Sequence, residues 1–227
     1  MSAAQPGANS EHLLFEAIRA GDASRVDEML EAAPGLARAR APEGASAVLM
    51  AIYCGHPEMV RLFEDRGVVL NLFEACAAGR RERVAALVAG DPALVGGYSA
   101  DGYPALGLAV FFGHDNIAGM LMERGADVNA ASRNSQCVTP LHAAAARHNA
   151  KLVADLLARG ADPDASQAGG ITALHEAAFH GDGEIVELLR GYGANPRQKT
   201  ADGKTAADMA TERGHGELAA QLARLAE

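Results

Sequence analysis

Apolar residues recur along this chain at helical spacing, in short stretches separated by glycine. In one such segment Leu174 and Ala177 fall on one face of a first helix, and the apolar residues of 185–189 form a second stripe. Thr172 suits the start of the first helix, because its hydroxyl can cap free backbone N–H groups. Gly181 suits its end, where a left-handed residue is favoured. The pattern predicts two short antiparallel helices, and neither can bury its stripe without a neighbour.

This helical segment repeats with a fixed period. The run Thr139–Ala144 (TPLHAA) recurs 33 residues later at 172–177 (TALHEA) and again at 205–210 (TAADMA). The first half of the chain carries an independent offset of 58 residues, because 14–71 matches the segment that follows it without a gap. Periods of 20 to 50 residues are typical of stacked-repeat proteins. The sequence therefore predicts a linear array of similar units.

These motifs resemble the ankyrin repeat, in which T-P-L-H-x-A-A is followed by a Gly-His turn and a closing G-A-D-x-N. The resemblance implies an all-α solenoid of about seven stacked helix-turn-helix repeats with short β-hairpin fingers. It covers nearly everything after Ser10, so we expect a flexible N-terminus at 1–10 and a single ankyrin-repeat domain at 11–227. The abundance of Ala, Gly and Arg resembles bacterial members of the family. The expected repeats are 11–40, 41–70, 71–98, 99–131, 132–164, 165–197 and 198–227.

The sequence departs from the ankyrin pattern between repeats two and three, in the proline-containing segments that end repeats one and three, and in repeat five. Gly67 and Ala75 are only 8 residues apart, whereas Gly160 and Ala177, at the matching positions of a later junction, are 17 residues apart. We therefore expect the finger to be missing between repeats two and three. In repeat five, the turn between the two helices has His148 where glycine is usual.

Composition narrows both the fold and the function. The chain has 50 Ala among 227 residues, no Trp and only 4% aromatic residues, which argues against a β-sandwich or barrel and favours closely packed helices. Its net charge of −9 argues against nucleic-acid binding through phosphates. No apolar run approaches the length of a membrane span, residues 1–10 lack the apolar core of a signal peptide, and three Cys without a CxxC motif fit a reducing compartment. We expect a cytoplasmic protein with no nucleic-acid and no membrane partner.

The eight histidines raise the question of catalytic or metal chemistry. The run HEAAFH at 175–180 resembles the HExxH zinc motif, but residues i and i+5 of a helix lie about 140° apart and do not share a face. No phosphate-binding loop, nucleophile elbow or EF-hand motif is present. We therefore expect no enzyme, no cofactor, no metal and no small-molecule substrate. Five histidines occupy structural positions of the repeat, namely His56, His114 and His215 in turns, and His142 and His175 at helix starts.

The resemblance places partner binding on the concave face, at the residues before each Gly-His turn and at the finger tips. Aromatic residues occupy several of these variable positions, and exposed aromatic residues in one groove are typical of protein-binding surfaces. The alternative is that the rings pack between repeats or over the missing finger. Both interpretations stay open for Phe111 and Phe112, whereas we favour binding for Tyr53 and Tyr103. The expected partner-binding residues are Tyr53, Cys54, Tyr98, Tyr103, Phe111, Phe112, Arg147, Phe179, His180 and Arg213.

The leading hypothesis for function is a non-catalytic protein-protein interaction module. It is expected to be a monomer that binds an unknown partner protein through the concave helix and finger face. The alternative is an inhibitor or immunity-type protein that blocks a specific partner enzyme. Both use the same physics of binding to a preformed surface, so the sequence does not separate them.

Overall fold

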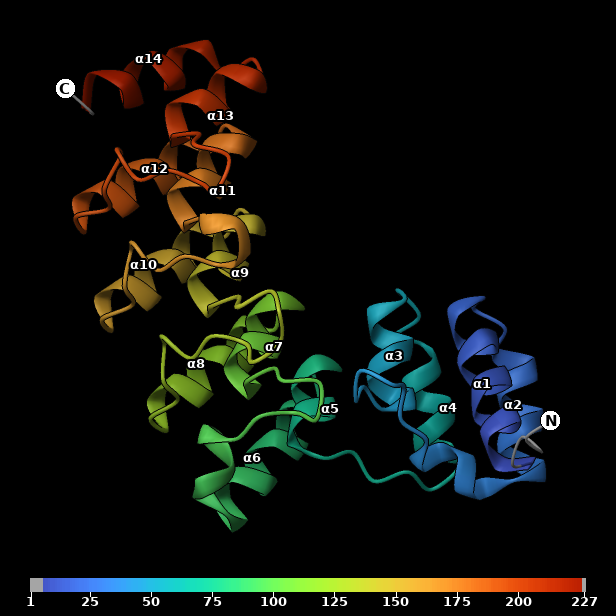
Figure 1. The fold of residues 1–227 in the computed structure, drawn as a ribbon. Coiled ribbons are helices and arrows are strands. Elements are labelled where there is room, and N and C mark those ends of the chain that lie inside the picture. Colours follow the sequence, from blue (N-terminus) through green and yellow to red (C-terminus); the bar gives the residue numbers. More distant parts are fainter. Residues whose placement is uncertain (1–5, 226–227) are drawn as a thin grey trace. The chain divides into compact units, whose positions relative to one another are not determined.

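The structure, a computed structural model, describes residues 6–225. Within that part the chain forms fourteen α-helices and three short 3₁₀ helices (Figure 1). They divide into two compact units, one up to Ala105 and one from Leu106 onward. The expected all-α fold class is confirmed.

The N-terminal unit consists of three consecutive helix pairs. A 3₁₀ helix follows the first pair (η1, Pro34–Arg38) and another follows the third (η2, Pro92–Gly96). Prolines open both 3₁₀ helices, because a fixed φ and a missing N–H are tolerated at the first position of a helix. The six helices are α1 (Pro6–Arg19), α2 (Ala23–Ala32), α3 (Ala47–Tyr53), α4 (Met59–Asp65), α5 (Leu72–Ala77) and α6 (Arg81–Gly90).

The C-terminal unit contains the helix pairs of the last four expected repeats. Its first helix, α7, begins at Ala105 on the boundary between the units. One 3₁₀ turn, η3 (Ala168–Gly170), lies before α11. The helices are α7 (Ala105–Phe111), α8 (Asp115–Glu123), α9 (Pro140–Ala146), α10 (Ala150–Ala158), α11 (Ala173–His180), α12 (Gly183–Gly191), α13 (Ala206–Glu212) and α14 (Gly216–Leu225).

The first ordered helix starts earlier than the expected repeat boundary at residue 11. Residues 6–10, which we expected to lie in a flexible N-terminus, form the first turns of α1. Proline is favoured at the first position of a helix, because the N–H that it lacks would have no partner within the helix. Residues 1–5 lie outside the described residues.

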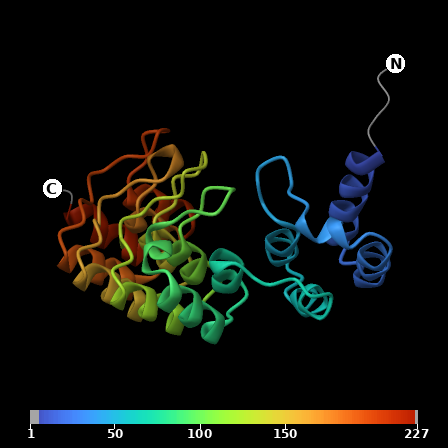
Figure 2. The same ribbon diagram turned by 90° about the horizontal axis from the view of Figure 1, so that it is seen from below.

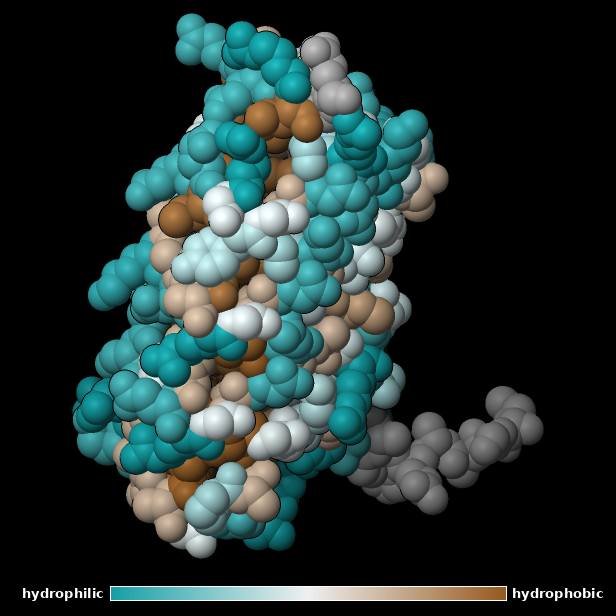
Figure 3. Space-filling model, turned by 90° about the vertical axis from the view of Figure 1, so that its left-hand side faces the viewer, coloured by the Kyte–Doolittle hydropathy of each residue, from teal (hydrophilic) through white to brown (hydrophobic). Residues whose placement is uncertain are grey.

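Alanine allows the first helices of the C-terminal unit to pack closely. Ala144, Ala177 and Ala210 occupy the same position in α9, α11 and α13, and all three are fully buried. These helices contact one another directly, α9 with α11 and α11 with α13. Larger side chains fill the space between first and second helices, as Leu156 and Leu189 do. In the upper part of Figure 3, hydrophobic residues accordingly show only as narrow brown areas between hydrophilic ones.

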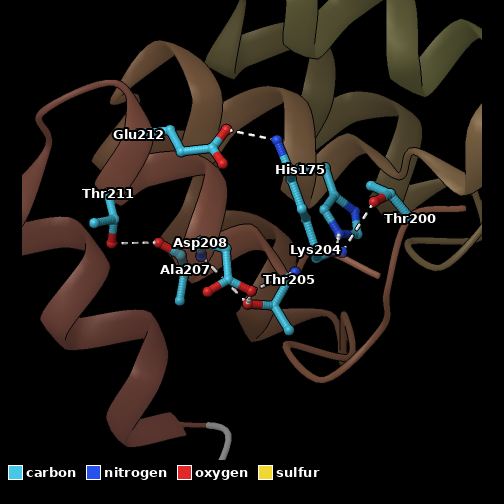
Figure 4. Close-up of polar contacts among 8 residues, drawn as sticks. All are labelled: His175, Thr200, Lys204, Thr205, Ala207, Asp208, Thr211 and Glu212. Atoms are coloured by element: carbon cyan, nitrogen blue, oxygen red, sulfur yellow. Dashed lines mark hydrogen bonds and ion pairs between the residues drawn. The ribbon is translucent and has the colours of Figure 1, made fainter. Parts of the chain in front are cut away.

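The threonine of each T-x-x-H or T-x-x-D motif caps a first helix. Thr172 accepts the backbone N–H of His175, whose imidazole Nδ1 in turn lies 3.2 Å from the Thr172 backbone nitrogen. Thr139 and His142 form the same reciprocal box. In α13 aspartate replaces histidine, so that the Asp208 carboxylate accepts the Thr205 backbone N–H at 2.9 Å (Figure 4). Each box satisfies two backbone donors that a helix start leaves open.

The remaining nitrogen of each capping imidazole joins one repeat to the next. His142 Nε2 lies 3.0 Å from the carbonyl oxygen of Ile171, and His175 Nε2 lies 3.3 Å from that of Lys204. Burial lowers the pKa of both imidazoles. Because Nδ1 accepts a hydrogen bond in the box, the neutral form with the proton on Nε2 satisfies both contacts. These two histidines therefore have structural roles.

The loops before the first helices extend to one side of the C-terminal unit (Figure 2). Neighbouring loops are linked by backbone hydrogen bonds, from the Ala168 nitrogen to the Gln136 oxygen and from the Ala201 nitrogen to the Gly169 oxygen. Within residues 6–225 the β-structure of such loops consists of three isolated bridges. They join Arg40 to Ser46, Tyr98 to Pro104, and Ser166 to Thr172.

In the N-terminal unit, α4 connects to α5 through a short extended segment. Residues 68–71 run without a turn, and among described residues no bridge forms between Gly67 and Asn71. The loops on either side of this junction, 40–46 and 98–104, contact each other instead. A Cβ on Gly44, whose φ is +99°, would lie 2.5 Å from the Ala100 carbonyl oxygen. The glycine is therefore needed both for its backbone conformation and for this close approach.

Candidate protein-binding surface

The expected binding residues fall into two groups, one in each unit. The first group lies on α3 and the loop 98–104, and the second lies at the ends of the first helices α7, α9, α11 and α13. The first group consists of Tyr53, Cys54, Tyr98 and Tyr103. The second group consists of Phe111, Phe112, Arg147, Phe179, His180 and Arg213.

Tyr53 is held by contacts within the N-terminal unit. Its hydroxyl donates a hydrogen bond to Asp101 Oδ2 at 2.7 Å, and its ring meets that of Tyr103 edge-on at 6.2 Å between centroids. Burial, together with the Asp101 carboxylate, raises the pKa of the Tyr53 hydroxyl, so it remains a donor. These contacts tie the end of α3 to the loop 98–104. They correspond to the packing alternative, whereas from the sequence we favoured binding for Tyr53 and Tyr103.

The other residues of this group surround the same junction. Cys54 is the half-buried C-cap of α3, and Tyr98 is a half-buried residue that forms a bridge with Pro104. Cys76, on the neighbouring helix α5, is buried, and burial raises the pKa of its thiol to about 12. A thiol that stays protonated at neutral pH is a weak nucleophile, so nothing in this arrangement supports cysteine chemistry.

The second group forms a continuous line of side chains in the C-terminal unit. Phe111 is 56% exposed and meets Phe112 edge-on at 5.0 Å between centroids. Arg147 Nη1 donates a hydrogen bond to the Phe111 carbonyl oxygen at 3.1 Å. Its guanidinium lies against Gly113, where a Cβ would clash with it. This glycine therefore lets an exposed arginine from α9 reach the end of α7.

The line continues across α11 to α13. His180 lies edge-on to Phe179 with 5.1 Å between ring centroids, and the Arg213 guanidinium carbon lies 4.4 Å above the Phe179 ring. Cations are attracted to the face of an aromatic ring by its quadrupole. His148 joins from the turn after α9, with its ring 4.7 Å from that of His180. We call this set the turn ridge, composed of Phe111, Phe112, Arg147, His148, Phe179, His180 and Arg213.

His148 was noted in the sequence as a departure but was not included among the binding residues. Its backbone is left-handed, with φ +57°. At the matching turns of the other repeats, this conformation is adopted by a glycine. A left-handed conformation costs a residue with a side chain about 1–2 kcal/mol. The imidazole Nδ1 lies 3.3 Å from Asp182 Oδ2. The signal available in the sequence was the loss of glycine in repeat five together with the loss of histidine after Gly181.

The described residues contain no cluster of three or more His, Cys, Asp or Glu side chains that could hold a metal ion. Between residues 6 and 225, no helix is both long and apolar enough to cross a membrane. The turn ridge combines aromatic rings, guanidinium groups and imidazoles that are exposed or half-buried.

Comparison with known proteins identifies the repeats. The family model described as ankyrin repeats (3 copies) matches residues 133–226, and the one described as ankyrin repeats (many copies) matches residues 108–157. The chain is 39% identical over 93 residues to the probable E3 ubiquitin-protein ligase XBOS31 of Oryza sativa subsp. japonica. That match covers 40% of this chain and 20% of the rice protein, so the chain spans about a fifth of that relative. Since the family matches together cover residues 108–226 and the described helices follow the repeat in order, the chain belongs to the ankyrin-repeat family.

Proposed function

We propose that this protein is a non-catalytic module that binds a partner protein through the first helices and fingers, with the turn ridge as its main contact. Ankyrin repeats generally mediate protein-protein interaction. The proposal includes a cytoplasmic location and a monomeric state. It also includes the four residues of the N-terminal unit as a separate contact area, since their half-buried side chains leave part of their surface to solvent.

The exposure of Phe111 carries the proposal. Its ring is one of four large hydrophobic side chains that are well exposed among the described residues. It lies beside Phe112 and the Arg147 guanidinium, so apolar and cationic surface are presented together. Aromatic and arginine side chains are the residue types that contribute most to protein interfaces. Such a surface fits a partner protein better than a small molecule.

The test is capture of proteins from a lysate of the source cell on the immobilised full chain. We expect Phe111→Glu and Phe179→Glu together to reduce the amount of the captured partner by about 10-fold or more, because a charge replaces a desolvated ring at an interface hot spot. Tyr192→Glu is the matched control, since Tyr192 is 49% exposed and lies at the end of α12, outside the turn ridge. Circular dichroism should be unchanged in all variants.

Equal capture by the wild type and the double Phe variant would contradict the proposal. If the captured partner is an enzyme, its activity in the presence of the chain separates an inhibitor or immunity-type protein from a scaffold. Loss of that activity on binding would favour the inhibitor.

A further inference from the structure

The turn at His148 reverses a contact that two other turns show. Gly21 lies against the imidazole of His56, and Gly181 lies against that of His215, so a glycine in one repeat faces a histidine from the next. At the turn after α9 the histidine comes first, and His148 pairs with Asp182 in the following repeat. The side chain of His148 is 51% exposed, compared with 26% for His56. The reversal moves an imidazole from between the repeats to the turn ridge.

The two arginines of the turn ridge have no carboxylate partner among the described residues. Arg147 donates to a carbonyl oxygen and Arg213 lies over a phenyl ring. Elsewhere in the chain Arg66 and Arg80 are each paired with carboxylates, at 2.7 Å in the shortest contacts. The turn ridge is therefore cationic, although the chain as a whole has a net charge of −9.

Two acidic groups beside the turn ridge are already engaged. Asp182 caps α12 through Oδ1, which accepts the Ile185 N–H at 3.2 Å, and holds His148 through Oδ2. Glu212, next to Arg213 in the sequence, pairs with Lys204 at 2.8 Å (Figure 4). Because these carboxylates are occupied, the guanidinium groups of Arg147 and Arg213 can bind other anions. Guanidinium groups bind carboxylates through two parallel hydrogen bonds, and an arginine that lies over a ring keeps its N–H edge free to do so.

We infer that the turn ridge recognises an acidic linear segment of another protein, in which carboxylates alternate with at least one large apolar side chain. This inference rests on the proposed function and specifies its partner. Carboxylates contact Arg147, Arg213 and the imidazoles of His148 and His180, and the apolar side chain packs on Phe111. Charge complementarity favours this partner, because Arg147 and Arg213 would repel a basic segment.

The test selects peptides on the full chain from a displayed library of randomised 15-residue sequences. We expect the enriched peptides to carry several Asp or Glu residues with Leu or an aromatic residue. A peptide synthesised from the enriched set should bind Arg147→Gln/Arg213→Gln about 10-fold or more weakly than the wild type, and binding should weaken with added salt. Arg159→Gln/Arg197→Gln is the matched control, because both arginines are exposed and lie outside the turn ridge.

His148→Gly gives a second readout. It restores the usual residue at the turn, so the midpoint of urea unfolding should stay equal or rise while the affinity for the acidic peptide falls. Loss of affinity without loss of stability shows that the imidazole contributes to recognition. Unchanged affinity in this variant removes His148 from the site.

Several outcomes would overturn the inference. Enrichment of neutral or basic peptides, or equal binding of the acidic peptide to both arginine double variants, excludes an acidic segment as the partner. Self-association of the chain that is lost in Arg147→Gln/Arg213→Gln assigns the turn ridge to a second copy instead. If partner capture depends on Phe111 and Phe179 but not on the arginines or on salt, the proposed function stands and this inference fails. If capture depends on neither set, both fail.

Discussion

Histidine occupies three kinds of position in this fold, and the surroundings decide what each imidazole does. His142 and His175 are buried at helix starts and accept hydrogen bonds on Nδ1. His56 and His215 lie against glycines of the preceding repeat. His148 and His180 are exposed on the turn ridge. One residue type therefore serves capping and stacking, and on the turn ridge we propose a role in recognition. Burial and contact partners distinguish these positions.

The two buried histidines should make the stability of the fold depend on pH. Burial lowers the pKa of His142 and His175 below the ordinary value of 6.5, so at acidic pH the unfolded chain binds more protons than the folded chain. Their contribution to the free energy of unfolding is complete above about pH 6.5 and is lost as the pH falls through the folded values. Urea unfolding at pH 8, 6.5 and 5 should show this loss for the wild type.

A variant with a different capping side chain isolates the effect. His142→Gln/His175→Gln keeps a capping box, because glutamine at this position reaches back to the same N–H, but it removes the titration. We expect its stability to change less between pH 8 and 5 than that of the wild type. His12→Gln serves as the control, since His12 is an exposed residue of α1. An equal pH dependence in all three proteins would disprove the role of burial.

At the scale of elements, the contact between α3 and the loop 98–104 compensates for the short connection from α4 to α5. The Tyr53 hydroxyl reaches Asp101 in a loop 48 residues further along the chain. Tyr53→Phe removes that donor from a buried carboxylate while keeping the ring contact with Tyr103. The variant should lose about 1.5–3 kcal/mol of unfolding free energy, the usual range for a hydrogen bond to a charged group.

Hydrogen exchange can show where in the chain Tyr53→Phe loses stability. The amide of Gly102, which donates to the Ser99 carbonyl oxygen within the loop, should exchange faster in Tyr53→Phe. Tyr192→Phe is the control, because Tyr192 is exposed at the end of α12. Equal stability of the two variants would mean that the Tyr53 hydroxyl does not support the loop.

The helices were predictable because their signals are local, whereas contacts between loops were not. Thr172 as a helix start and Gly181 as a left-handed helix end depend on neighbours within a few residues, and the structure confirms both. The close approach of Gly44 to Ala100 joins residues 56 positions apart, and no periodic pattern encodes it. The contact between His148 and Asp182 was visible in the sequence only as two separate irregularities, a histidine in place of glycine and an aspartate in place of histidine. The binding role of the turn ridge stays a prediction.

At the scale of the whole molecule, the high alanine content has a mechanical consequence. Helices that meet through alanine approach closely, and many small contacts replace a few large ones. Stacked repeats contact mainly their neighbours, so damage at one interface should spread only over a short distance along the stack. Ala144, one of the fully buried alanines of α9, allows this to be tested inside a single helix.

Ala144→Leu should overpack the interface between α9 and α11. Ala144 is fully buried and α9 contacts α11, so three added carbon atoms must displace the surrounding helices. Overpacking of this kind costs about 1–3 kcal/mol. We expect a loss of that size in urea unfolding and faster hydrogen exchange in α9 and α11, with a smaller change in α14.

Ala146→Leu adds the same atoms to an exposed position of the same helix and should change stability by less than about 0.5 kcal/mol. Similar losses in the two variants would show that the chain tolerates larger side chains between its helices, and that alanine is not what sets their spacing.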